Sequence, residues 1–196
     1  MKTLKLFFLI SAFSSTSILS GQNKFVNYDY IVFKVTGDLN NDGLSDKVLV
    51  KVDKNDKYLP NLLIVQFQNK EGNYKTVLSS TKAVLPKFTS NGGTSEATLE
   101  KLEIKNGILT FTNQLIRGSF SHKFRFQKGN FELIGFQSNN ANAGYIESID
   151  YNLSTGDKIV KHTDYETDKI IKQIKTKDKI SPLPKLQDFT PFDFTY

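Results

Sequence analysis

The sequence predicts an all-β protein, mostly antiparallel and rich in hairpins. Short segments of β-branched and aromatic residues recur along the chain, and clusters of Asn, Asp, Gly and Lys separate them, which is the pattern of strands joined by turns. The dipeptide Asn106-Gly107 stands between two such segments and is a strong signal of a two-residue hairpin turn. No convincing helical period of ten or more residues follows residue 21. We therefore expect strands that pair mainly with their sequence neighbours.

Four strands are expected in the first half of the chain. The segment 47–52 alternates three valines on one face with Lys and Leu on the other, so one face of this strand is suited to burial. Pro60 keeps the chain extended just before the most apolar segment. The four predicted strands span residues 28–35, 47–52, 62–68 and 74–78.

The second half begins after a flexible loop, Asn91-Gly92-Gly93. Three hairpins are predicted here, with turns at Asn106-Gly107, 128–130 and 154–157. The last apolar segment, 168–176, fits either a strand or a short helix, and we favour a strand because its neighbours are strands. The predicted hairpins pair residues 99–105 with 108–115, 120–127 with 131–136, and 145–152 with 158–162.

The first 21 residues have the features of a secretory signal peptide. Lys2 and Lys5 form a positive start, an apolar segment begins at Leu6, and the small residues Ser20 and Gly21 suit cleavage after residue 21. The apolar segment is too short and too interrupted by serine for a membrane-spanning helix. We therefore expect a secreted or periplasmic protein with no transmembrane segment in its mature chain.

A single β domain is expected to fill most of the mature chain. The chain has 196 residues, 38% of them hydrophobic, which is enough for one core of ordinary size. The predicted domain spans residues 22–180, with an N-terminal half (28–80) and a C-terminal half (98–176). Residues 181–196 are expected to form an extended tail. The tail side chains expected to pack on the sheet are Leu183, Leu186, Phe189 and Phe192.

Composition excludes several kinds of site and partner. The chain has no cysteine, which excludes disulfides, zinc–thiolate sites and a thiol nucleophile. Two histidines, His122 and His162, leave little room for a histidine-rich metal site. The net charge of +6 is mild and only two arginines occur, so nucleic acid is not an expected partner.

One loop stands out as a candidate metal site. Between two predicted strands, residues 38–46 place oxygen-bearing side chains at loop positions 1, 3, 5 and 9 and a glycine at position 6. Ca²⁺ takes roughly six to eight oxygen ligands in a flexible shell, and Gly43 permits the sharp turn that such a loop needs. The expected ligands are the side chains of Asp38, Asn40, Asp42 and Asp46 and the backbone carbonyl of Leu44.

The alternative for this loop is a metal-free turn. In that case the side chains of Asp38 and Asn40 accept hydrogen bonds from nearby backbone amides in Asx-turns. If a metal binds, calcium is favoured over magnesium because a flexible, all-protein shell suits the larger ion. The spacing of the oxygen ligands and the glycine favours calcium binding over the metal-free turn.

The flanking residues decide which kind of calcium loop this is. An EF-hand requires a bidentate Glu at loop position 12, where this chain has Leu49, and a strand rather than a helix follows the loop. The run Gly-Asp-Leu-Asn-Asn-Asp-Gly-Leu-Ser-Asp that begins at Gly37 closely resembles the calcium loop of FG-GAP/VCBS-type repeats, as in integrin-like β-propeller blades. The resemblance covers residues 32–80, including the apolar segment 62–65 and the turn 72–74.

This resemblance implies a propeller-blade-like N-terminal half with calcium ligands at Asp38, Asn40, Asp42, Asp46 and the Leu44 carbonyl. The motif occurs once, and 196 residues are too few for a seven-bladed propeller, so a full propeller is not expected. As a whole the chain is similar to small secreted bacterial proteins with a signal peptide, one such repeat and a hairpin-rich remainder. That wider likeness implies no activity.

Other titratable residues form no catalytic signature. His122 and His162 lie in no nucleophile motif and are expected to be half-exposed strand histidines. The spacing of Glu96, Glu100 and Glu103 singles out no carboxylate pair suited to glycoside hydrolysis.

Residues 158–185 hold eight lysines and four acids. We expect them to form a solvated strand edge protected by lysines, with binding to an anionic glycan or lipid surface as the alternative.

The expected function is that of a secreted, non-catalytic β domain, stabilised by one calcium ion and acting as a binding or envelope-associated module. Its expected partner is a protein or glycan of the cell envelope. The alternative is a secreted hydrolase acting on glycan or peptide, with a cleft lined by converging carboxylates or a His–Ser pair. The aromatic alternation at the C-terminus also resembles outer-membrane strands, but charges within segment 47–51 argue against a lipid-facing band.

Overall fold

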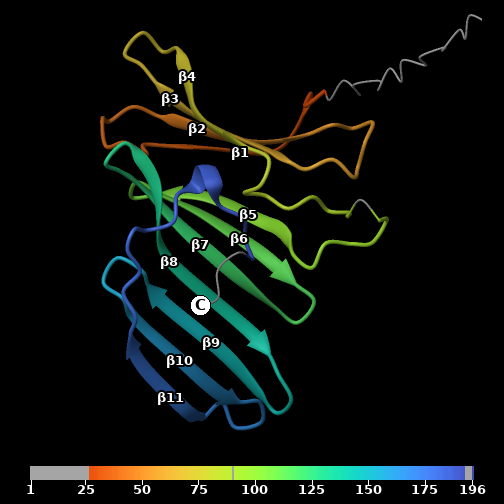
Figure 1. Cartoon of the computed structure of the whole chain (residues 1–196), viewed down its shortest axis with the longest axis vertical. Coiled ribbons are helices and arrows are strands. Elements are labelled where there is room, and N and C mark those ends of the chain that lie inside the picture. Colours follow the sequence, from red (N-terminus) through yellow and green to blue (C-terminus); the bar gives the residue numbers. More distant parts are fainter. Residues whose placement is uncertain (1–26, 90, 193–195) are drawn as a thin grey trace, which may run out of the picture.

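Two antiparallel sheets make up the fold (Figure 1). The computed structural model describes residues 27–89, 91–192 and 196, so the predicted signal peptide, residues 1–21, lies outside the described part. Within that part the structure has eleven strands and one short 3-10 helix but no α-helix. The predicted all-β, hairpin-rich class is confirmed, and the last apolar segment is a strand.

The smaller sheet is a four-stranded meander in which each strand pairs with the next. This is the connectivity of a single propeller blade. The valines of the alternating segment face the core, where Val48 and Val50 are fully buried and pair with Val65 and Leu63 of the neighbouring strand. The strands are β1 (Tyr30–Gly37), β2 (Asp46–Val52), β3 (Leu62–Gln68) and β4 (Tyr74–Ser80).

The larger sheet is a seven-stranded antiparallel meander whose edges are β5 and β11. Consecutive strands pair along the whole sheet, so every connection within it is a hairpin. In chain order the strands are β5 (Thr98–Lys105), β6 (Ile108–Leu115), β7 (Gly118–Gln127), β8 (Asn130–Ala141), β9 (Tyr145–Asn152), β10 (Asp157–Asp164) and β11 (Ile170–Lys177).

Two of the hairpin turns explain how the large sheet is held in register. At Asn106-Gly107 the φ angles are 52° and 70°, which is the type I′ geometry that matches the twist of paired strands. Lys128-Gly129 adopts the same kind of turn, with φ angles of 51° and 76°. Because Gln127 pairs directly with Asn130, this turn has two residues rather than the three expected.

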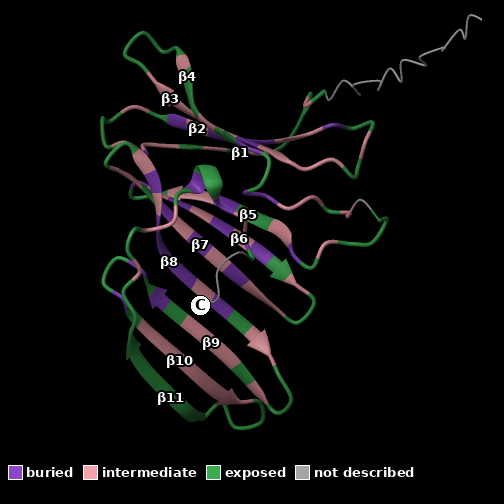
Figure 2. Cartoon of the chain, in the orientation of Figure 1, coloured by how far each residue is buried: buried purple, intermediate pink, exposed green. Residues whose placement is uncertain are grey.

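The hydrophobic core lies between the small sheet and the β5–β8 part of the large sheet (Figure 2). Phe67 of β3 bridges the two sheets, because its ring centroid lies 4.9 Å from that of Phe126 on β7 and 6.0 Å from that of Phe131 on β8. At the edge, the backbone of Gly37 on β1 lies against the Ile104 side chain on β5.

The tail after β11 returns to this core and covers part of it. The carbonyl of Pro184 accepts the backbone N–H of Leu133 at 2.8 Å, and the 3-10 helix η1 (Leu186–Asp188) follows. Leu186 and Phe189 are buried, and Leu183 packs against the core. Phe192 contacts the ring of Phe120 but is 47% exposed.

The last two strands, β10 and β11, extend beyond this core (Figure 1). None of the residues of β10 or β11 is fully buried, and all eight residues of β11 are exposed. In the described part of the chain no helix is long and apolar enough to cross a membrane.

Candidate metal centre

The oxygen-rich loop connects β1 to β2 at one end of the small sheet. It lies against the β5–β6 turn, because a methyl group added at Gly107 would come within 3.2 Å of the Asn41 side-chain oxygen. Asn41 has φ of 62° and Gly43 has φ of 82°, so two residues of the loop adopt left-handed conformations. Such conformations favour Asn and Gly, which explains why these residues stand at the tightest points of the turn.

Three of the predicted ligands lie in one turn and hold it by hydrogen bonds. The two carboxylate oxygens of Asp38 accept the backbone N–H groups of Asn41 at 2.7 Å and Gly43 at 2.9 Å. The side-chain oxygen of Asn40 accepts the N–H of Asp42 at 3.1 Å, and the Asn40 amide donates to the Asp42 carboxylate at 2.9 Å. These are the local Asx-type bonds that the sequence allows as the alternative to a metal.

Leu44, whose carbonyl is a predicted ligand, follows directly in the same turn. Its backbone N–H donates to a carboxylate oxygen of Asp42 at 2.8 Å. Asp42 therefore accepts hydrogen bonds at both of its oxygens, while its side chain remains exposed at the tip of the loop.

Asp46, the last predicted ligand, is placed differently. Its side chain is fully buried, and its two oxygens accept the N–H of Leu39 at 2.8 Å and the N–H of Gln68 at 3.0 Å. The first bond closes the loop on itself and the second joins it to the end of β3. Asp46 is therefore a structural cross-link between the loop and the sheet.

The electrostatics of Asp46 link it to the other two carboxylates. Burial raises the pKa of Asp46 above its ordinary value, the two backbone N–H bonds lower it, and the negative charges of Asp42 and Asp38 raise it further. The net pKa shift is upward. The charges of Asp38 and Asp42 therefore oppose ionisation of Asp46, and a cation held near them would counter that effect.

The donor set fits a hard cation in its chemistry. An ionised carboxylate offers about four lone-pair positions, so an oxygen that accepts one N–H can still bind a cation. Among the described residues, no group of three or more His, Asp or Glu side chains is arranged to hold a metal ion. A calcium ion in this loop would therefore draw on the Asn40 amide oxygen and on backbone carbonyls as well as on carboxylates.

Side chains from β2, β3 and β4 that lie outside the loop 38–46 support it. The side chain of Gln68 accepts the N–H of Ser45 at 3.2 Å, and the Tyr74 hydroxyl donates to the Ser45 carbonyl at 3.2 Å. The ammonium group of Lys47 lies 3.5 Å from the centre of the Tyr74 ring. Because Gln68 and Tyr74 lie more than twenty residues after the loop, only pairing of the strands reveals these contacts.

The two histidines have contrasting surroundings. The expectation of a half-exposed His122 is wrong, because this residue is fully buried and the rings of Phe120, Phe136, Phe189 and Tyr196 pack around it. Neither of its ring nitrogens has a hydrogen-bond partner among the described residues, and burial lowers its pKa to about 3. Its alternation with Phe120 and Phe124 on one strand is the sequence signal that indicates this burial.

His162 and the three glutamates do not converge on one site. The His162 ring is half-buried, lies 3.1 Å from the Glu147 carboxylate and stacks on Tyr145. Glu103 forms an ion pair with Lys101 at 2.9 Å, which lowers its pKa. Glu96 and Glu100 are exposed.

Comparison with known proteins adds no relative to this description. Neither a scan against protein-family models, nor a search of curated proteins, nor a search of solved structures returns a match for this chain.

Proposed function

We propose that this protein is a non-catalytic binding module of the cell envelope, in which one calcium ion held by the loop 38–46 stabilises the small sheet. The observation that supports the proposal most directly is the position of Asp46. It is fully buried and links the loop to β3. The negative charges of Asp38 and Asp42 raise its pKa. A cation in the loop would counter the repulsion among these three carboxylates and so favour the folded state.

The size of the effect follows from mass action. An ion that binds only the folded state stabilises it by RT ln(1 + [Ca²⁺]/Kd), which is about 1 kcal/mol at a few times Kd. Extracellular calcium modules bind with Kd of about 10⁻⁴–10⁻³ M. A secreted location, which the first 21 residues predict, would suit a site of this affinity.

Thermal unfolding tests the metal part of the proposal. Residues 22–196, loaded with calcium, should melt at a lower temperature after chelation with EDTA, and added calcium should restore the original value while magnesium restores less. Asp42→Asn should remove the difference between the calcium and EDTA curves. Asp164→Asn is the matched control, because Asp164 also accepts backbone N–H bonds in an exposed turn but lies outside the loop. Identical melting curves with calcium and with EDTA would refute the metal site.

The binding role has its own test. Immobilised protein should retain an envelope component when calcium is present and less of it in EDTA.

The alternative of a secreted hydrolase gains no support from the histidines, because aromatic rings enclose His122 and His162 is paired with Glu147.

A further inference from the structure

The edge strand β11 differs from every other strand in its surroundings. It pairs with β10 on one side only, and all eight of its residues are exposed. Figure 2 shows it as a continuous exposed strand at the end of the sheet farthest from the core. The backbone N–H and C=O groups along its outer side are therefore available for pairing with another strand.

Apolar side chains along this edge are exposed as well. Ile170, Ile171 and Ile174 are 54%, 58% and 41% exposed. Tyr165, in the turn before β11, is 43% exposed. Lysines and short length normally protect a free edge, but β11 is eight residues long and exposes three isoleucines. Protection alone does not account for these isoleucines, whereas a docked strand would bury them.

The register of the hairpin shows what each face of β11 offers. Ile174 pairs with Val160, and its neighbours Lys172 and Thr176 pair with His162 and Lys158. Because alternate residues of a strand share a face, one face of β11 presents an isoleucine between a lysine and a threonine. The opposite face presents Gln173, Lys175 and Lys177.

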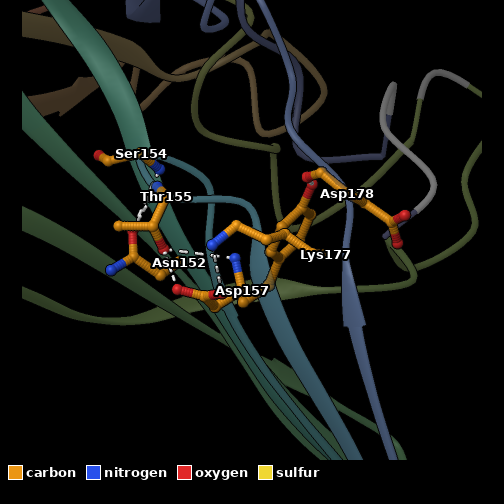
Figure 3. Close-up of polar contacts among 7 residues, drawn as sticks. Asn152, Ser154, Thr155, Asp157, Lys177 and Asp178 are labelled. Atoms are coloured by element: carbon orange, nitrogen blue, oxygen red, sulfur yellow. Dashed lines mark hydrogen bonds and ion pairs between the residues drawn. The ribbon is translucent and has the colours of Figure 1, made fainter.

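The positive charge of β11 favours an acidic partner. β11 contains three lysines and no acidic residue. Lys177 pairs with Asp157 at 3.3 Å, at the β9–β10 turn (Figure 3), whereas Lys172 and Lys175 take part in none of the ion pairs of the described residues. Two copies of β11 paired edge to edge would gather six lysines at one seam, which disfavours a second copy of this chain.

We propose that the edge of β11 is a docking site for an extended, acidic segment of another protein, which adds to the large sheet as an eighth strand. This proposal rests on the proposed role as a binding module and names its partner class. Main-chain hydrogen bonds supply affinity in this mode, and alternate side chains supply specificity. The fitting segment places an apolar residue beside Ile174 and carboxylates beside Lys172 and Lys175.

A synthetic peptide provides the probe. A labelled peptide whose glutamates stand three residues apart, with valine and threonine between them to match the spacing of Lys172, Ile174 and Lys175, is titrated with residues 22–196 at low ionic strength, and binding is followed by fluorescence anisotropy. We expect saturable binding that weakens as salt is added. A peptide with lysine in place of glutamate should not bind, and neither should one whose alternate amides are methylated so that it cannot pair as a strand.

Charge reversal locates the site. The double variant Lys172→Glu/Lys175→Glu should bind the glutamate peptide about tenfold more weakly, a change of about 1.4 kcal/mol, and should gain affinity for the lysine peptide. Lys70→Glu/Lys75→Glu is the matched control, because it reverses two lysines at the β3–β4 hairpin and at the exposed edge of the small sheet. Backbone NMR shifts on titration should concentrate in β10 and β11.

Several outcomes would overturn the proposal. Peptide binding that β11 charge reversal does not change would place the site elsewhere. If sedimentation shows a dimer and the β11 variant abolishes it, the occupant of the edge is a second copy of this chain. If the protein binds anionic vesicles through these lysines but does not bind the peptide, the partner of the edge is a membrane. The two proposals can fail separately. If calcium does not change the melting temperature but the peptide still binds, only the metal site is refuted. If calcium raises the melting temperature but the peptide does not bind, only the docking edge is refuted.

Discussion

A carboxylate oxygen of Asp46 accepts the backbone N–H of Gln68 at 3.0 Å. This bond joins the first residue of β2 to the last residue of β3, and the second oxygen of Asp46 accepts the buried N–H of Leu39. One side chain therefore links the loop to the ends of the two central strands of the small sheet.

Removal of the Asp46 carboxylate should destabilise the protein strongly. Asp46→Ala leaves the N–H groups of Leu39 and Gln68 without their acceptor, and we expect a loss of about 2–5 kcal/mol in the free energy of unfolding, measured by urea denaturation. Asp164→Ala removes an acceptor from an exposed turn and should cost about 1 kcal/mol or less. Equal losses in the two variants would contradict the structural role of Asp46.

The burial of His122 predicts sensitivity to acid. Its pKa falls from an ordinary 6.5 to about 3 in the folded protein, so below pH 6.5 the unfolded chain binds a proton that the folded chain does not. The contribution of the neutral, buried His122 to the free energy of unfolding is therefore fully present above pH 6.5 and is lost progressively as the pH falls toward 3. The loss from this residue should reach about 2–3 kcal/mol at a pH of about 4.5.

The variant His122→Phe isolates this contribution. It should remain folded, because phenylalanine suits the aromatic surroundings, and its stability should fall less between pH 7 and about pH 4.5 than that of the unaltered protein. Other groups, including Asp46, titrate alike in both proteins and cancel in the comparison. His162→Gln serves as the control, and parallel stability profiles for the His122 variant and the unaltered protein would rule out the predicted role.

In the tail, Phe189 should contribute strongly to the free energy of unfolding, whereas Phe192 should contribute little. Phe189 is 2% exposed, and its ring lies 4.7 Å from that of His122 and 5.0 Å from that of Phe124. Phe189→Ala should cost about 3–5 kcal/mol. Phe192→Ala removes a half-exposed ring and should cost less than about 1 kcal/mol. Chemical denaturation of both variants measures the difference, and a similar small cost for both would show that the tail does not pack as described.

The contact between the two sheets should tolerate no added methyl group at Gly37. A Cβ there would lie 2.6 Å from Ile104 Cγ2, so Gly37→Ala should push β1 away from β5 and cost about 1–3 kcal/mol. At Gly135, by contrast, a Cβ would find only ordinary contacts at 3.5 Å or more, and Gly135→Ala should be tolerated. Thermal unfolding of the two alanine variants tests the close approach, which a harmless Gly37→Ala would disprove.

Much of the fold could be predicted because local signals and strand pairing agree. The strands β3, β6 and β9 have the predicted bounds, since turn residues limit each of them on both sides. β8 runs on to Ala141 rather than ending near residue 136. Its polar continuation has no strand pattern of its own and is extended because it pairs with β7 and β9.

The parts that could not be predicted depend on contacts between distant segments. The alternation of His122 with Phe120 and Phe124 indicates the core face, but the rings that complete its enclosure come from β8 and the returning tail. In the loop, the spacing of Asp38, Asn40 and Asp42 correctly indicates one tight turn. It could not indicate that Asp46 binds the N–H of Gln68, because that contact requires β2 and β3 to be paired.

Calorimetric titration with calcium tests the central claim most directly. Residues 22–196, stripped of metal with EDTA and dialysed, should bind one calcium ion per chain with a Kd of about 10⁻⁴–10⁻³ M, and Asp42→Asn should abolish the heat of binding. A folded protein that gives no saturable calcium-binding heat well above that concentration range would contradict the account.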